Sequence, residues 1–198
     1  MVNDVYTSSV RLIGLVNDFL NMSRLEQGRM VYKKETFDMS TLVEEVVKEY
    51  TIAAAEKKLY LKADLAPGFA GAVFADRSKV KEVLINFIGN ALKFTPTGGI
   101  TIHLSQEMNV ALVRVQDTGK GIPRDNQALL FRKFQQAGKD IYARDMSQGS
   151  GLGLYISKLM MQGMGGTIGL ENSVPEQGSV FFFSLPLAKE VRSGTIKK

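Results

Sequence analysis

Two stretches in the middle of the chain alternate between apolar and polar side chains. They run over Ile100–Ser105 and Ala111–Asp117, and a short polar turn separates them. Successive side chains of a strand point to opposite faces of a sheet, so this pattern predicts an antiparallel hairpin with one apolar face. A chain built around such a hairpin has to cover that face with another layer, and this requirement constrains the fold more than any other feature of the sequence.

The remaining helices and strands follow one another irregularly. Residues 135–149 are polar and contain glycine, which predicts a mobile loop, and such loops are usually functional or disordered. The order of elements indicates an α+β fold: a two-layer α/β sandwich whose mixed sheet is covered on one face by helices, preceded by one long amphipathic helix. The apolar spacing predicts helices over about 2–28, 40–57, 77–94 and 151–163, and further strands around 35–37 and over 59–65, 72–75, 166–171 and 180–185.

Composition excludes several classes of function. The chain has no cysteine and a single histidine, His103, which excludes thiol chemistry, Cys-ligated metals and multi-His metal sites. Of the net charge of +5, the last ten residues supply +3, so the body is too close to neutral for a nucleic-acid binder. No apolar run reaches the roughly 18 to 20 residues that cross a bilayer. We therefore expect a soluble, cytoplasmic segment without membrane contact of its own, whatever anchors a parent protein elsewhere.

The first helix carries an apolar stripe with no preceding segment to cover it. Val5, Leu12, Val16 and Phe19 follow at spacings of seven, four and three residues. This pattern predicts either a dimer seam or contact with a partner helix.

Asp117 stands where the second strand of the hairpin ends, in the sequence Asp-Thr-Gly-Lys-Gly. It shares a strand face with Val113 and Val115, so its carboxylate is expected to point to the apolar side, where an unpaired charge is costly. Gly119 and Gly121 would allow the backbone to approach a flat ligand closely. An Asx-type turn explains Asp-Thr-Gly alone equally well.

Three glycines, Gly149, Gly151 and Gly153, open the last helix. Exposed N–H groups and the positive end of the helix dipole at such a start suit phosphate oxygens. The spacing is neither that of a P-loop nor that of a dinucleotide fingerprint.

Asn86, Asn90 and Lys93 share one face of an otherwise apolar helix. Hydrated Mg²⁺ and phosphates would satisfy them, with an amide oxygen as metal ligand and the lysine as a point charge on phosphate. The alternative is a polar stripe that faces water.

Taken in order, these motifs resemble the N, G1, F and G2 boxes of the catalytic and ATP-binding domain of sensor histidine kinases. They are Asn86-x3-Asn90-x2-Lys93, Asp117-x-Gly119-x-Gly121, Phe131-x2-Phe134 and Gly149-x-Gly151-x-Gly153, and the match extends over about residues 35–186. The resemblance implies a Bergerat-type (GHKL) fold that binds ATP between the sheet, the helices and a lid.

The resemblance also implies a role for each matching residue. Asp117 would accept a hydrogen bond from the adenine amino group, Asn90 would ligate Mg²⁺, and Asn86 and Lys93 would contact metal-bound water or phosphate. Phe131 and Phe134 would anchor the lid, and no residue is assigned as a catalytic group. With ATP and Mg²⁺ as cofactors, the implied nucleotide-binding residues are Asn86, Asn90, Lys93, Asp117, Gly119, Gly121, Ile122, Phe131, Phe134, Gly149, Ser150, Gly151, Leu152 and Gly153.

The first helix resembles the end of the second helix of that family's dimerisation and phosphoacceptor hairpin. The implied division is residues 1–30 for this hairpin segment, 31–186 for the catalytic ATP-binding domain and 187–198 for a basic tail or linker. The acceptor histidine should lie on a preceding helix, and His103, in the middle of a strand, cannot replace it. The implied partners are ATP, a second copy joined through the full-length hairpin, and a response regulator receiver domain.

Three functions fit these residues. The first is a two-component histidine kinase module that holds Mg-ATP for γ-phosphate transfer to a histidine outside this chain. The second is a regulatory or pseudokinase module that binds ATP without transfer, and the third is a slow GHKL-type ATPase. Hydrolytic relatives of this fold carry a glutamate four residues before the metal-binding asparagine, where this chain has Asn86, so transfer is favoured.

Overall fold

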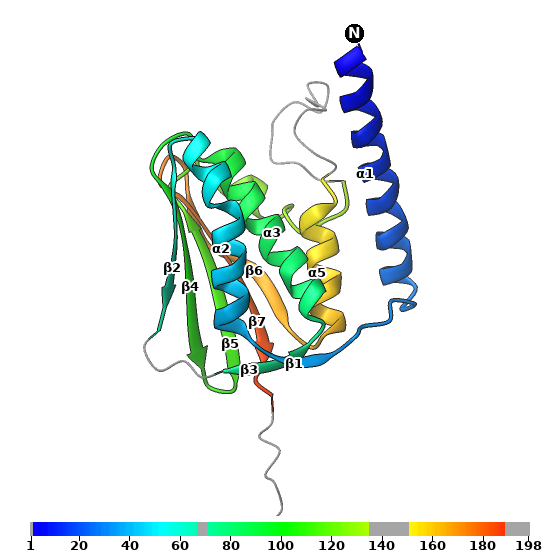
Figure 1. Ribbon diagram of the computed structural model, residues 1–198, viewed down its shortest axis with the longest axis vertical. Coiled ribbons are helices and arrows are strands. Elements are labelled where there is room, and N and C mark those ends of the chain that lie inside the picture. Colours follow the sequence, from blue (N-terminus) through cyan, green and yellow to red (C-terminus); the bar gives the residue numbers. More distant parts are fainter. Residues whose placement is uncertain (1, 67–70, 135–150, 189–198) are drawn as a thin grey trace, which may run out of the picture.

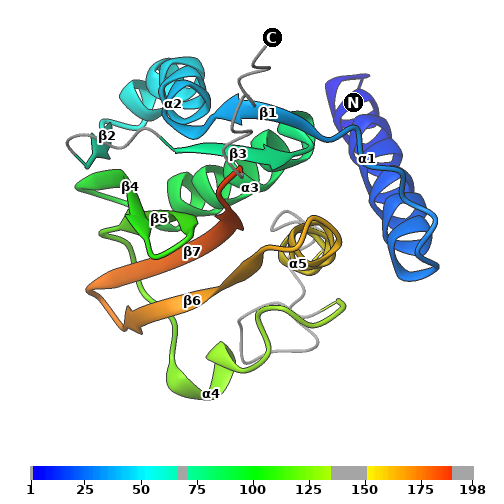
Figure 2. The ribbon, with the colours of Figure 1, turned by 90° about the horizontal axis from the view of Figure 1, so that it is seen from below.

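Helices cover one face of a five-stranded sheet (Figures 1 and 2). The computed structural model describes residues 2–66, 71–134 and 151–188. In spatial order the strands are β2 (Tyr60–Leu65), β4 (Gly99–Glu107), β5 (Val110–Asp117), β7 (Gly178–Pro186) and β6 (Thr167–Val174). Strand β2 runs parallel to β4, and the other pairs are antiparallel. The predicted mixed sheet and both predicted hairpins are confirmed.

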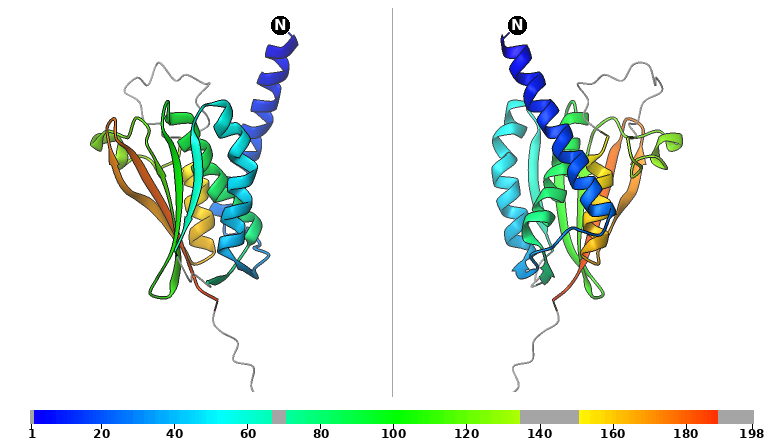
Figure 3. Two further views of the ribbon diagram at one scale, coloured as in Figure 1. Left: turned by 60° about the vertical axis from the view of Figure 1, so that its left-hand side comes forward. Right: turned by 90° about the vertical axis from the view of Figure 1, so that its right-hand side faces the viewer.

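The covering layer consists of α2 (Met39–Glu56), α3 (Arg77–Phe94) and α5 (Gly153–Gly163). Figure 3 shows these three helices side by side on the same side of the sheet. Their positions agree with the helical periods of the sequence, and α3 begins and ends at the predicted residues. The α+β two-layer sandwich is therefore confirmed.

Aspartates fix where α2 and α3 begin. Asp38 accepts a hydrogen bond from the backbone N–H of Thr41 at 2.9 Å, so it is Asp38 that caps α2. Asp76 caps α3 and also accepts from the backbone N–H of Lys33 at 2.9 Å. These bonds satisfy N–H groups that a helix start leaves without partners, and the second ties the segment after α1 to the body of the domain.

One strand pairing and one helical turn were not predicted. Strands β1 (Glu35–Asp38) and β3 (Ala72–Ala75) pair with each other as a separate two-stranded sheet, whereas the sequence suggested no such pairing. The single turn α4 (Arg124–Gln127) follows Pro123. The predicted loop at 135–149 lies outside the described residues.

Helix α1 (Val2–Glu26) contacts the body of the domain through its C-terminal end. Met22 is buried in the core, and Glu26 forms an ion pair with Lys133 and accepts a hydrogen bond from the hydroxyl of Tyr155 at 2.7 Å. Farther up the helix the apolar side chains are 48% to 62% exposed: Leu12, Ile13, Val16, Phe19 and Leu20. The predicted stripe is thus present and uncovered. No helix among the described residues is long and apolar enough to cross a membrane.

Aromatic rings connect the helix layer to the sheet. Phe87 of α3 lies with its ring centroid 5.4 Å from that of Phe181 and 6.1 Å from that of Phe183, both on β7. Phe87 is only 2% exposed. The contact holds α3, with its polar residues, at a fixed height above the sheet.

We expect Phe87→Ala to lower the free energy of unfolding by about 3 to 5 kcal/mol, since it leaves a cavity between α3 and β7. Urea unfolding followed by circular dichroism measures this. Phe74→Ala is the matched control: Phe74 on β3 is 56% exposed, and its loss should change stability by less than about 0.5 kcal/mol. Equal effects of the two substitutions would contradict the assigned role of Phe87.

Candidate functional site

Asp117 is a buried carboxylate at the end of β5. It is 6% exposed, and its Oδ1 accepts a hydrogen bond from the backbone N–H of Gly119 at 2.8 Å. Burial raises the pKa of Asp117 above its ordinary value, and hydrogen bonds from the backbone N–H groups of Gly119 and Ser179 partly oppose that rise. A buried acceptor held by backbone donors is well suited to receive one more donor from a ligand.

The loop after Asp117 is packed too closely for side chains at its glycines. A Cβ on Gly119 would lie 2.5 Å from the carbonyl oxygen of Phe94, and one on Gly121 would lie 2.0 Å from that of Val174. Gly121 also has a φ of +61°, in the left-handed region. The two glycines therefore let this loop fit between the end of α3 and β6.

Ile122 continues the same loop. Its backbone N–H donates to Ser173 Oγ at 2.8 Å, and its carbonyl oxygen accepts from Gln127 Nε2 at 2.8 Å. These bonds join the loop and α4 to β6, so the loop that begins at Asp117 is fixed at both ends.

The polar face of α3 meets the beginning of α5. Asn86 donates from Nδ2 to Ser157 Oγ at 2.9 Å, and Asn90 donates from Nδ2 to Asn86 Oδ1 at 3.5 Å. A Cβ on Gly153 would lie 2.7 Å from Asn86 Oδ1, so the two helices touch at this point. Lys93, one turn further on, is exposed, with Nζ 4.8 Å from the centroid of the Phe94 ring.

The first turn of α5 has no side-chain cap among the described residues. Its N-cap is Leu152, whose side chain is buried, and Gly151 just before it has a φ of +68°. Uncapped N–H groups at a helix start suit an anion. The predicted residues Gly149 and Ser150 lie outside the described residues, and their role stays a prediction.

The two predicted lid phenylalanines lie in different surroundings. The Phe131 ring packs edge-on against Phe181 at a centroid distance of 6.4 Å, and it thus extends the aromatic contacts of α3 and β7. Phe134 is 50% exposed. Of the two, only Phe131 is anchored in the described residues.

One residue near the site was missed by sequence reasoning. Phe94 ends α3 with its ring 46% exposed, and its carbonyl oxygen accepts from the backbone N–H of Lys120. An exposed aromatic ring next to the Asp117 loop could cover a flat ligand. The signal available in the sequence was an aromatic residue directly after Lys93, at a helix end where core packing does not need one.

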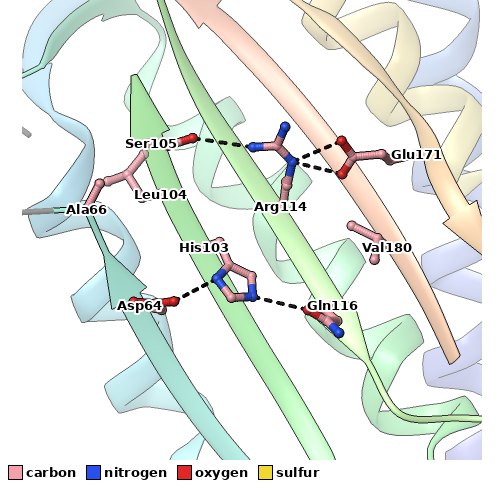
Figure 4. Close-up of a pocket in the computed structure, with 9 residues that line it drawn as sticks. All are labelled: Asp64, Ala66, His103, Leu104, Ser105, Arg114, Gln116, Glu171 and Val180. Atoms are coloured by element: carbon pink, nitrogen blue, oxygen red, sulfur yellow. Dashed lines mark hydrogen bonds and ion pairs between the residues drawn. The ribbon is translucent and has the colours of Figure 1, made fainter. Parts of the chain in front are cut away.

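The opposite face of the sheet carries another group of polar side chains, in a groove (Figure 4). His103 lies 2.9 Å from Asp64 and 3.2 Å from Gln116, and Arg114 binds Glu171 with Nε 2.8 Å and 3.1 Å from its carboxylate oxygens. These groups satisfy one another across four strands. Within residues 2–66, 71–134 and 151–188 no three acidic or histidine side chains are grouped to hold a metal ion. The groove is thus the weaker candidate.

The family of the chain follows from comparison with known proteins. The model of the histidine kinase-, DNA gyrase B- and HSP90-like ATPases matches residues 75–189, more than half of the chain. The chain belongs to this family. Within it, the chain has the ATP-binding catalytic domain found in sensor histidine kinases.

Similar curated proteins are histidine kinases. The signal transduction histidine-protein kinase BarA of Escherichia coli (strain K12) is 33% identical over 191 residues, which is 94% of this chain and 20% of BarA. The circadian input-output histidine kinase CikA of Synechococcus elongatus is 35% identical over 187 residues, or 93% of this chain and 24% of CikA. The chain thus spans about a quarter or less of the length of these relatives.

Solved histidine kinases share the fold. Full-length ShkA in complex with AMPPNP superposes with a TM-score of 0.82 at 30% identity, over 95% of this chain and 38% of ShkA. The catalytic domain of histidine kinase ThkA, in a nucleotide-free form, gives 0.66 at 28% identity, over 79% of this chain and 96% of that domain.

We predict that Asp117→Asn weakens ATP binding by roughly 10- to 100-fold, the usual loss when a charged hydrogen-bond acceptor becomes neutral. The amide has one acceptor oxygen, already needed by backbone donors, and its NH₂ would oppose the adenine amino group. Calorimetric titration measures the change, and an unchanged affinity would contradict the assignment of Asp117.

The same variant tests the pH dependence. The predicted acceptor for the adenine amino group is the carboxylate form of Asp117, so wild-type affinity should fall as the pH is lowered through the raised pKa and should be constant above it. Asp117→Asn lacks this step. Because the titration of ATP itself affects both proteins alike, the difference between the two profiles reports on Asp117. Parallel profiles would count against the raised pKa.

Proposed function

We propose that this chain holds Mg-ATP for transfer of the γ-phosphate to a histidine that lies outside it. The observation that carries the proposal is that the polar face of α3 meets the start of α5 about Asn86, Asn90 and Gly153, and that no side-chain cap is found there among the described residues. Side-chain amides of α3 and backbone N–H groups of α5 thus lie together, Lys93 follows one turn further along α3, and Asp117 lies at the end of β5. The AMPPNP complex of the relative ShkA supports a nucleotide as the ligand.

The donors present fit a magnesium ion held jointly with phosphates. Because the described residues contain no cluster of acidic or histidine ligands, the protein would supply Asn90 Oδ1, and phosphate oxygens and water would supply the rest. Mg²⁺ is commonly bound in this way, through one or two protein oxygens plus substrate phosphates. When bound, the ion would neutralise charge on the phosphates during transfer.

The surroundings of α3 favour transfer over hydrolysis. The position four residues before Asn90 is Asn86, whose amide is engaged by Ser157 and cannot act as a general base. The nearest acid on that helix, Glu82, is exposed and pairs with Lys79 at 2.9 Å. Water activation therefore has no group to perform it among these residues, which makes the slow ATPase the less favoured function.

We predict that calorimetry of the chain with ATP gives markedly tighter binding with Mg²⁺ than with EDTA, since the ion links Asn90 to the phosphates. Asn90→Ala should remove most of that difference, while binding of adenosine, which reaches only the Asp117 end of the site, is retained. Binding of equal strength with and without Mg²⁺ would contradict the metal assignment, and absence of any ATP binding would contradict the function.

Transfer itself needs an acceptor. We expect that extending the chain with the preceding helix of a histidine kinase hairpin yields label from γ-³²P-ATP that is stable to alkali and labile to acid, as phosphohistidine is. The Asp117→Asn form of the same extended protein is the control and should be labelled far more weakly at ATP concentrations below its dissociation constant. Tight Mg-ATP binding without any labelling would favour the regulatory or pseudokinase alternative.

The first helix and the partners are part of the same proposal. We infer that residues 1–30 belong to a dimerising and phosphoacceptor hairpin, that residues 31–186 form the catalytic ATP-binding domain, and that 187–198 form a basic tail or linker. The uncovered stripe of α1 supports pairing with a second copy. A receiver domain would take the phosphate from the histidine, in a cytoplasmic setting.

We predict concentration-dependent self-association of the chain through this stripe. Replacing Val16 and Phe19 by Glu puts charge into the apolar seam and should give a monomer at all concentrations, with an unchanged melting temperature because both side chains are exposed. Sedimentation velocity from about 1 to 200 µM measures this. A wild-type monomer throughout that range would contradict the prediction.

A further inference from the structure

A chain of hydrogen bonds links α5 to the candidate metal ligand on α3. It runs from Ser157 to Asn86 at 2.9 Å and from Asn86 to Asn90 at 3.5 Å. We propose that Ser157 is a positioning residue that acts through Asn86 to aim the side-chain oxygen of Asn90 at the metal ion of a bound Mg–nucleotide. This inference rests on the function proposed above.

The two ends of an asparagine amide bind opposite kinds of group. Oxygen accepts and binds cations, whereas the NH₂ group donates and repels them, and a turn of 180° about the last side-chain bond exchanges the two at little intrinsic cost. An asparagine that ligates a metal therefore needs a neighbour that decides which end faces the ion. In metal sites this function falls to the hydrogen-bond partner of the ligand.

In this chain each partner fixes the next. Asn86 turns its Nδ2 to Ser157 Oγ, so its Oδ1 faces Asn90 one helical turn further on. Asn90 donates from its Nδ2 to that oxygen, which leaves its own Oδ1 directed away from Asn86. The 3.5 Å bond is at the long limit for a hydrogen bond, so it is the weaker of the two links.

Packing keeps Asn86 in place for this role. Gly153 lies against its amide: a Cβ at Gly153 would be 2.7 Å from Oδ1 and 3.3 Å from both Cγ and Nδ2. Ser157 is 3% exposed, so water does not readily replace its hydroxyl. The amide of Asn86 thus occupies the space that a side chain at position 153 would need, beside the buried hydroxyl of Ser157.

Loss of the Ser157 hydroxyl would therefore leave the packing of the core intact but no longer fix the orientation of the Asn86 amide. With no acceptor on α5, Asn86 is free to turn its NH₂ toward Asn90. Two NH₂ groups would then oppose each other, and Asn90 would relieve this by turning its own NH₂ outward, toward the position of the cation. The metal-dependent part of nucleotide binding should suffer, and the adenine end should not.

The test compares Ser157→Ala with wild type in ATP titrations with Mg²⁺ and with EDTA. We expect the ratio of the two dissociation constants to shrink roughly tenfold, the lower end of the loss seen when a metal ligand is deprived of its hydrogen-bond partner. The affinity in EDTA should stay within about twofold. A merely structural role of Ser157 would lower both affinities, so a change in the ratio alone supports the positioning role.

Ser184→Ala is the matched control, since it also removes a buried serine hydroxyl. That hydroxyl forms a hydrogen bond with Thr167 at 2.7 Å. Ser184 lies on β7, five residues after Ser179, which pairs with Asp117. This variant should leave the ratio unchanged. Ser157→Cys is a second variant in case Ser157→Ala fails to fold, because a thiol has nearly the size of the hydroxyl and is a weak acceptor. Melting temperatures are recorded for all three.

A second readout needs no metal or nucleotide. In ¹H–¹⁵N spectra of the free protein, Ser157→Ala should shift or broaden the side-chain amide signals of both Asn86 and Asn90, whereas the backbone signal of Gly119 stays in place. Unchanged Asn90 signals would overturn the proposed relay.

The outcomes separate this inference from the proposed function. If wild type shows metal-dependent binding and Ser157→Ala keeps the same ratio, the positioning role is wrong and the function stands. Equal losses with Mg²⁺ and with EDTA would likewise overturn the positioning role. If wild type binds ATP without any metal dependence, the metal site itself is wrong and the inference falls with it.

Discussion

A carboxylate buried at the end of a strand requires compensation, and the surroundings of Asp117 are built to provide it. The N–H groups of Gly119 and Ser179 face its oxygens, and the chain has to fold back tightly to bring them there. That is why side chains are excluded at Gly119, Gly121 and Gly178, where a Cβ would lie 2.5 Å or less from a carbonyl oxygen. Placing this one carboxylate thus brings the glycine loop close to the end of α3, the end of β6 and the start of β7.

Helices and strands with a regular period could be predicted from the sequence, because the spacing of their apolar residues shows which face is buried. Helix α3 and strand β3 begin and end where apolar spacing and turn residues put them. The pairing of β1 with β3 could not be predicted, since four-residue strands carry little pattern and the contact joins Phe37 to Val73 across a whole helix and a strand. Helix α4 is a single turn, too short for any period.

In the candidate site too, residues that belong to a local pattern could be predicted, and contacts between distant residues could not. Spacing alone put Asn86 and Asn90 on one helix face, and alternation put Asp117 on the buried face of its strand; both placements are found in the structure. The Ser157 contact is different, because it joins residues 71 positions apart and a serine within a helix carries no signal of its own. Phe94 was missed because an aromatic residue in an apolar helix is ordinarily read as core, although its place at the helix end was a signal of the exposure that the structure shows. The assigned roles in binding stay predictions.

The joint between α1 and the body combines apolar packing with a single carboxylate. Met22 is buried and Leu25 packs against the core, while one carboxylate oxygen of Glu26 contacts both Lys133 and Tyr155, in the first turn of α5. Lys133 lowers the pKa of Glu26, and Tyr155 adds to that effect, so the joint stays charged at neutral pH. Each residue of a helix turns 100° from the last, so rotating α1 by a single residue carries Glu26 away from both partners at once. One carboxylate thus connects α1 to both segments that border residues 135–150, so the position of this helix and the contacts of the two segments depend on each other.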